Sequence, residues 1–319
     1  PLSGVLTLGV IYTIGPYLLP DLVRNSINMT PQMPLIASVA GPLWRQPDRR
    51  HVAFLYNLLA LLAVHAGFYA ALLGGHDPMP WLRLSIGVLM ALIIVALSRI
   101  SMRLVNDVLE AQGGESAPYM ARPPRRNLAV FAIAAYSAGE FLLPGHAVAG
   151  WLALAAAAAI ANLLNDWHVG RALLQRWALI PYLVYVCMAL GYALIGLGRL
   201  SGNEMTSAGE HLLVVGSLGL AVLIVMAVAG RMHSGWGLDH RRWLPLGALL
   251  FVLAALARAG SSTPFGAAAA TAGLHAAATL WIAGWSIYLA YSLKPLSGPR
   301  PDDRGGCDEA APVVEAATP

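Results

Sequence analysis

Charged side chains are scarce in this sequence of 319 residues. Asp, Glu, Lys and Arg together make up 11% of the chain, whereas 58% of the residues are hydrophobic and the mean hydropathy is +0.64. A formal net charge of +4, scattered along such a chain, does not form the basic patch that binds nucleic acid. Nearly every stretch of about 20 residues is apolar enough to cross a bilayer, so the composition predicts an all-α, polytopic transmembrane bundle.

Several motifs with known chemistry are also missing. The two cysteines, Cys187 in an apolar run and Cys307 in a polar tail, are not expected to form a disulfide. No Cys-x-x-Cys-His motif occurs, so any haem would be held non-covalently. There is no adjacent His-His pair and no Walker, serine-nucleophile or zinc-protease motif. Glu140 is the only carboxylate clearly inside a predicted span, so no Asp/Glu proton relay is visible.

Hydrophobic runs divide the chain into about ten predicted spans of roughly 17–25 residues, the length that a ~30 Å hydrocarbon core requires. The predicted spans are 2–20, 29–44, 52–74, 80–104, 127–143, 147–165, 178–198, 211–230, 243–260 and 268–292. Because the first run is already under way at residue 2, we expect the transmembrane domain, 1–293, to be incomplete at its N-terminus. Residues 294–319 are polar and rich in Pro, Gly and Ala, which predicts a disordered cytoplasmic tail.

Positive charge is distributed unevenly between the two ends of these spans. Sixteen of the 20 Lys and Arg residues fall at alternate span ends, and only Arg24, Arg83, Arg199 and Arg258 fall at the opposite ends. Cytoplasmic loops carry the excess of positive charge in membrane proteins. The bias and the even number of spans together predict that both ends of this chain are cytoplasmic.

Nine histidines stand out in so apolar a sequence. An ionisable side chain inside a membrane is a candidate site residue, and neutral imidazole is the commonest metal ligand. His65 and His275 lie inside spans at similar depth in the predicted outer half, whereas His211 begins a span at the outer surface and His233 lies at a cytoplasmic end. For His65 and His275 two interpretations remain open, a cofactor ligand or a hydrogen bond between helices.

Other candidate residues accompany the histidines. The span that begins at His211 continues into a Gly-Ser-Leu-Gly stretch at 216–219, where small residues let a helix or a flat macrocycle approach the backbone. The same span ends in Met232-His233, a thioether and an imidazole that suit copper. Arg99, near the inner end of the fourth span, has the geometry to pair with a haem propionate, although an arginine near a helix end also reaches the interface without a ligand.

Four segments carry a resemblance to a known family. They are Trp44 to Arg50 leading into 54–59, Ser98-Arg99-Ile100 to Asn106, Glu210-His211-Leu212 to Gly219, and Arg231-Met232-His233-Ser234-Gly235. These segments resemble motifs of the NnrS family, bacterial inner-membrane proteins that contain haem and copper and act in the response to nitric oxide and nitrosative stress. The chain departs from the family pattern at Met102, Leu104 and Trp236. It also has no counterpart of the family's early His-x-His-Glu-Met-like segment.

The resemblance implies a bundle of about twelve spans in a complete member, against about ten here. It implies bound haem and copper. Together with the imidazoles inside the spans, the candidate haem-binding residues are His211, His65, His275 and Arg99, and the candidate copper ligands are His211, His233 and Met232. The implied role is protection against nitric oxide in the bacterial inner membrane, and no catalytic reaction follows from these residues. Two alternatives stay open: a haem oxidoreductase or electron carrier linked to quinol, and a metal-free solute transporter.

Overall fold

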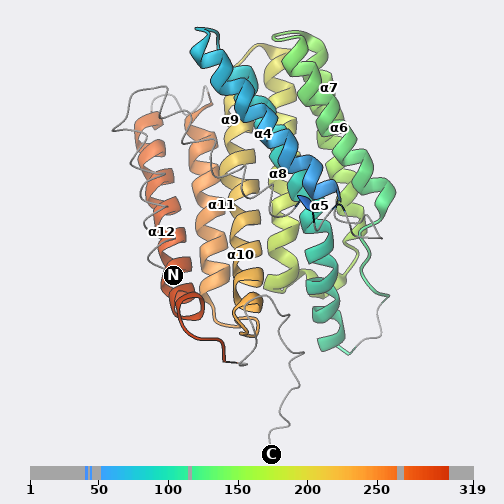
Figure 1. The fold of residues 1–319 in the computed structure, drawn as a ribbon, viewed down its shortest axis with the longest axis vertical. Helices are drawn as coiled ribbons and strands as arrows, with labels where there is room; N and C mark the ends of the chain where they lie inside the picture. Colours follow the sequence, from blue (N-terminus) through green and yellow to red (C-terminus); the bar gives the residue numbers. More distant parts are fainter. Residues whose placement is uncertain (1–39, 42–43, 45–51, 114–116, 264–268, 302–319) are drawn as a thin grey trace, which may run out of the picture.

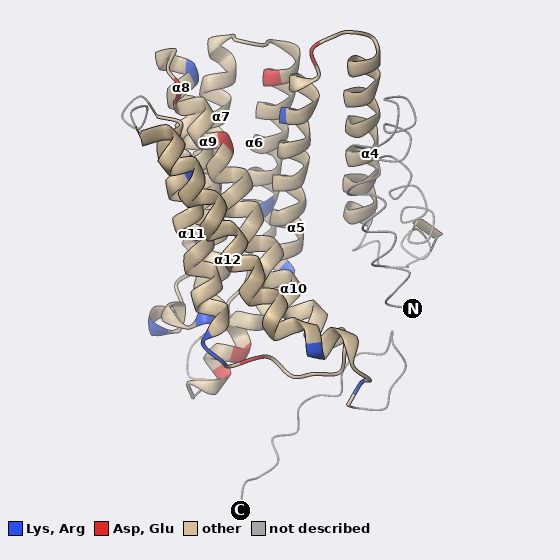
Figure 2. Cartoon of the chain, turned by 90° about the vertical axis from the view of Figure 1, so that its left-hand side faces the viewer, with Lys and Arg blue, Asp and Glu red and all other residues tan. Residues whose placement is uncertain are grey.

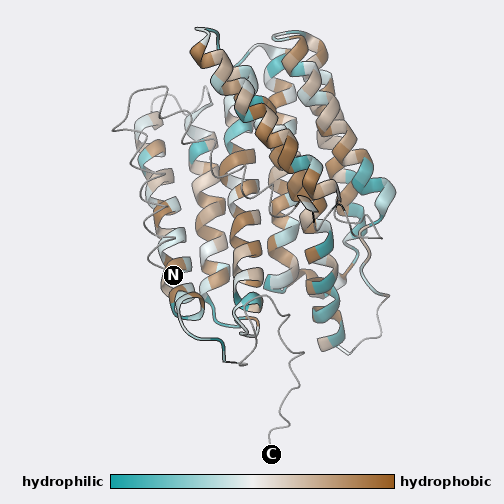
Figure 3. Ribbon diagram, in the orientation of Figure 1, coloured by the Kyte–Doolittle hydropathy of each residue, from teal (hydrophilic) through white to brown (hydrophobic). Residues whose placement is uncertain are grey.

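The computed structural model describes residues 40–41, 44, 52–113, 117–263 and 269–301, and in these ranges all regular secondary structure is helical. The helices stand side by side as one bundle with their axes roughly parallel, except that α4 crosses the others obliquely (Figure 1). Brown, hydrophobic residues follow most of each helix in Figure 3. The predicted all-α class is therefore confirmed.

The described elements follow one another without long connections. They are α4 (Val52–Leu73), α5 (Met79–Ala111), α6 (Pro123–Leu142), α7 (Ala147–Leu163), η1 (Leu164–Asp166), η2 (Gly170–Leu174), α8 (Arg176–Ser201), α9 (Met205–His211), η3 (Leu212–Leu218), α10 (Gly219–His233), α11 (Trp243–Ser261) and α12 (Ala270–Ser297). Helix breakers set the boundaries: α6 begins at Pro123, and α8 ends at Gly202, whose φ of 68° is left-handed.

Seven helices among the described residues are long and apolar enough to cross a membrane. Eight of the ten predicted spans fall on described helices, and the eighth helix, α6, carries Arg125, Arg126 and Glu140 and does not meet the same criterion. The predicted spans 2–20 and most of 29–44 lie outside the described residues. The count of ten is thus not confirmed, whereas a polytopic membrane protein is.

The predicted span boundaries need two clear corrections. The span predicted to start at 211 belongs to a helix that begins at Met205, so His211 lies inside the helix and not at its start. The fourth span was predicted to end at residue 104, but α5 continues to Ala111. The extra turns are polar, so a hydropathy criterion ends the span too early, although their backbone remains helical. Asn106 in this extension binds the backbone of Tyr119 through both its amide and its carbonyl, at 3.2 and 2.7 Å, and so fastens the following loop to the helix.

The bundle has an interior and a periphery. The helices α5 and α8 and the continuous helix 205–233 are the most buried, whereas α4 and α12 bury the least surface. Most charged residues lie toward the two ends of the bundle (Figure 2). We call the end that holds the start of α5 and the end of α8 the outer end, after the orientation that the arginine distribution predicts.

Candidate functional site

A large cavity of about 1160 Å³ lies at the outer end. Its walls come from the start of α5, the end of α8, the helix α9 and the first residues after it, with Gly145 and Ser262 from neighbouring turns. The polar side chains on these walls are Arg83, Ser85, Arg199, Asn203, Glu204, Thr206, Ser207, Glu210, His211 and Ser262. A concave site of this size with a few convergent polar groups is typical of a ligand pocket.

His211 is the only histidine among the cavity's lining residues. Its ring Nδ1 lies 2.7 Å from the backbone oxygen of Ser207, one turn earlier on α9. A carbonyl can only accept a hydrogen bond, so Nδ1 carries the proton in the neutral ring and Nε2 is left with a lone pair. Histidines that bind metals are held in this way by their second nitrogen. His211 therefore has the ring orientation of a metal-binding histidine and faces the cavity.

The helix changes its winding directly after His211. Residues Leu212–Leu218 form a π-helix between α9 and α10, all within one continuous helix. A π segment inserts an extra residue into the turn and is frequent at functional sites. Val214 and Leu218 of this segment line the cavity.

Four charged side chains from four helices form a network beside the cavity. Arg83 Nε lies 2.8 Å from Glu210 Oε1, and Arg83 Nη1 lies 3.9 Å from Glu140 Oε1. Arg199 also pairs with Glu140. The Glu140 side chain is only 5% exposed, so its charge requires these partners. The second oxygen of Glu140 has no hydrogen-bond partner among the described residues.

Three of the four exceptions to the arginine bias lie at or beside this cavity. Arg83 and Arg199 line the cavity and pair with carboxylates. Arg258 donates to the Ser262 hydroxyl at 2.6 Å, and Ser262 lines the same cavity. From the sequence, these arginines were interpreted only as indicators of membrane topology, and their position at this site was not predicted. The sequence did contain a signal for this site: arginines at the span ends where positive charge is otherwise rare, together with Glu140 inside a span.

A second, smaller pocket of about 290 Å³ lies at the inner end. It brings together three predicted site residues, Arg99, Met232 and His233, with Arg103 as a further lining residue. The two guanidinium groups make the pocket cationic, which opposes the binding of a metal cation. Met232 and His233 supply a thioether and an imidazole there, so a complete copper site would need additional ligands.

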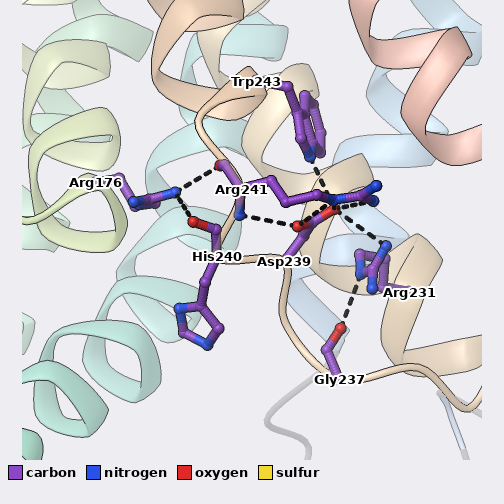
Figure 4. A network of polar contacts seen from close by, with 7 residues as sticks. All are labelled: Arg176, Arg231, Gly237, Asp239, His240, Arg241 and Trp243. Atoms are coloured by element: carbon purple, nitrogen blue, oxygen red, sulfur yellow. Dashed lines mark hydrogen bonds and ion pairs between the residues drawn. The ribbon is translucent and has the colours of Figure 1, made fainter.

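The loop after His233 is organised by one buried carboxylate (Figure 4). Arg241 donates to both oxygens of Asp239, at 2.9 and 2.6 Å, and Trp243 Nε1 donates at 2.8 Å. Arg231 binds the same carboxylate at 3.4 Å and the Gly237 carbonyl at 2.8 Å. Hydrogen bonds from Arg241, above all, hold the pKa of Asp239 well below its usual range.

The remaining predicted site residues lie apart from both pockets. His65 is half-buried on α4, and His275 is exposed on the surface of α12. Neither lines either pocket. The described residues contain no group of three or more His, Cys, Asp or Glu side chains placed to hold a metal ion. The structure therefore does not gather the predicted haem ligands His65, His211 and His275 around one cavity.

The small residues at 216–219 have a packing role. A Cβ at Gly216 would lie 3.2 Å from Cys187 Sγ on α8 and from Ala255 Cβ on α11. A Cβ at Gly219 would lie 2.7 Å from the Trp281 ring on α12. These glycines let three neighbouring helices approach the π segment, and neither lines the cavity.

Comparison with known proteins gives one match. The model of the NnrS family, described as "NnrS protein", matches residues 6–300. No curated protein and no solved structure matches the chain. The match spans every helix described above and includes both pockets.

Proposed function

The chain belongs to the NnrS family, and from this premise we propose that it is a haem- and copper-containing protein of the bacterial inner membrane that protects against nitric oxide and nitrosative stress. The seven long apolar helices support a protein that crosses the membrane several times. The bound haem and copper and the role in nitric-oxide stress are what we propose.

The observation that supports the proposal best is the state of His211. Its Nδ1 is engaged by the Ser207 carbonyl at 2.7 Å, so Nε2 is the nitrogen left to bind iron. The cavity beside it, about 1160 Å³, is large enough for a macrocycle of haem size. Haem bound there would supply an iron centre that binds nitric oxide and exchanges electrons with it. Of the residues that line this cavity, His211 is thus the one that would hold the iron.

The propionate partner is better assigned to Arg83 than to Arg99. The two arginines are 16 residues apart on α5, about 24 Å along the helix axis. Arg83 lines the His211 cavity, whereas Arg99 lines the inner pocket. Arg83 and Arg199 would hold propionates while remaining close to Glu210 and Glu140. Copper stays part of the proposal through Met232 and His233, which form an incomplete donor set.

The test is an optical spectrum and a metal analysis of the purified full-length protein in detergent. We expect a Soret band and bound copper in the parent, and loss of the Soret band in His211→Ala. His146→Ala is the matched control, because His146 is exposed in the turn before α7 and lines neither pocket. His233→Ala tests the copper ligand separately.

Two outcomes would redirect the proposal. A folded protein without haem or copper would favour the metal-free transporter. Haem that is reduced by quinol, without any effect of the protein on survival in nitric oxide, would favour the quinol-linked electron carrier.

A further inference from the structure

A third hollow, of about 470 Å³, opens between α4, α5 and α6, and we call it the α4–α6 groove. Small residues from all three helices line it, namely Ala60, Gly87, Ala91, Ala134 and Ala138. Phe141 forms an aromatic wall and is held edge-on by Trp81, with ring centroids 4.7 Å apart. Small side chains opposite an aromatic wall leave a flat space suited to a planar ring.

The α4–α6 groove is not uniformly apolar. Ser137 and Asn57 both line it. The Ser137 hydroxyl is buried and has no hydrogen-bond partner in the described part of the chain. Gly87 packs against that hydroxyl, because a Cβ at residue 87 would clash with it. Asn57 donates one amide hydrogen to the Ala53 carbonyl at 2.8 Å, which leaves its second amide hydrogen as a donor.

These polar groups lie inside the apolar part of the bundle. Ser137 is three residues before Glu140 on α6, and Gly87 is four residues after Arg83 on α5, so both lie one helical turn deeper than the charged network. A hydroxyl left unpaired at this depth is costly unless a ligand or water binds it. The acyl chain of a lipid offers no polar atom there, and lipid headgroups remain at the surface.

We propose that the α4–α6 groove binds the ring of an isoprenoid quinone that enters from the bilayer. A quinone ring is flat and apolar on its faces, and it carries oxygens on opposite edges. Ser137 would donate to one oxygen, the second amide hydrogen of Asn57 would donate to the other, and Phe141 would stack on the ring. The isoprenoid tail would leave past Tyr56 and Leu142, which are exposed on the rim.

The position of the groove favours a quinone over a redox-inert isoprenoid. The Arg83–Glu140 pair lies between this groove and the large outer cavity: Arg83 lines the cavity, Glu140 pairs with Arg83, and both residues are within one helical turn of Gly87 and Ser137. One oxygen of Glu140 is buried and has no hydrogen-bond partner among the described residues. The groove therefore places a quinone one helical turn from a carboxylate and beside the cavity of the proposed function. Binding itself requires no cofactor in that cavity.

The test uses decylubiquinone, added to the purified full-length protein in lipid nanodiscs. Quinones quench tryptophan fluorescence at short range, and Trp81 packs on the groove wall, so binding is followed by quenching. We expect saturable quenching, a Kd raised tenfold or more by Ala134→Leu, which fills the groove, and a Kd raised roughly three- to tenfold by the isosteric Ser137→Ala. Ala155→Leu, at an exposed position of α7 outside the groove, is the matched control and should change nothing.

Three results would overturn the proposal. They are quenching that does not saturate, an unchanged Kd in both groove variants, and displacement of the quinone by decylbenzene at equal affinity, which would make the groove a site for lipid chains. Ser137→Ala adds no atoms and keeps the test valid if Ala134→Leu does not fold. His211→Ala should bind decylubiquinone like the parent, so a failure of the haem proposal is distinguishable from a failure of this one.

Discussion

Individual charged residues in this protein are satisfied by partners from distant parts of the chain. Glu140 pairs with Arg199, 59 residues away, and Glu210 pairs with Arg83, 127 residues away. Each carboxylate is at least mostly buried, and a buried charge that loses its partner is strongly destabilising. The histidine at the cavity is similarly constrained, because the Ser207 carbonyl selects its tautomer.

Asp239 leads to a prediction on pH dependence. Its folded-state pKa is lowered, chiefly by hydrogen bonds from Arg241. The carboxylate therefore contributes stability that is fully present above the unfolded-state pKa of about 3.9 and declines as the pH falls below that value. We expect the thermal unfolding temperature in detergent to be nearly constant from about pH 5 to 7 and to fall in more acidic buffer.

Asp239→Asn checks the assignment to this residue. The variant should unfold at a lower temperature at pH 7, and its unfolding temperature should depend less on pH than that of the parent. Asp77→Asn, at an exposed position between α4 and α5, is the control. If the unfolding temperatures of Asp239→Asn and of the parent fall in parallel as the pH decreases, another group causes the loss of stability in acid.

At the scale of elements, close contact between helices depends on a few glycines. The helices α8 and α9 meet at Gly191 and Gly209, where a Cβ on residue 209 would clash with the Gly191 carbonyl. This contact holds α9, and with it His211 and Glu210, against α8. Small residues that allow two backbones to approach are the usual basis of helix packing in membranes.

Gly209→Ala should therefore destabilise the protein by about 1–3 kcal/mol, because an atom must be inserted between two backbones. Gly260→Ala is the matched control: Gly260 also lies in a helix, but nothing lies within 4 Å of its Cβ position. That substitution should be neutral or stabilise by up to about 1 kcal/mol, because alanine favours the helix. Reversible thermal or denaturant unfolding in detergent measures both changes, and equal effects at the two positions would contradict the packing argument.

At the scale of the whole molecule, the orientation in the membrane is a prediction from the arginine distribution. It places the turns at His76 and His146 outside and the end of α5 inside. With Cys307 replaced by serine and Cys187 buried, single cysteines at His76, His146 and Gln112 give a direct test, since all three positions are exposed.

A membrane-impermeant maleimide should label His76→Cys and His146→Cys in right-side-out vesicles, and Gln112→Cys only in inside-out vesicles. Detergent-solubilised protein should be labelled at all three positions, which controls for reactivity. The reverse pattern in sealed vesicles would invert the proposed topology and place the His211 cavity on the cytoplasmic side.

Much of the fold and part of the site were predictable from the sequence. Local hydrophobicity determines which segments enter the membrane, so the helices from α4 to α12 were predicted within about five residues, apart from the polar end of α5 and the start of the helix that holds His211. His211 was predicted as a site residue because an imidazole at the start of an apolar run is conspicuous. The family, too, is carried by short local motifs.

Only the tertiary structure decided which residues meet. The helices are apolar nearly all round, so the sequence carries no amphipathic stripe to show which side of a helix faces the interior. Helix rotation and neighbours are instead set by backbone contacts, such as that between Gly191 and Gly209, and by ion pairs across 59 and 127 residues. For this reason the sequence predicted His211 at the start of a span and His275 inside one, whereas the structure decided that His211 lines a cavity and His275 lies on the surface.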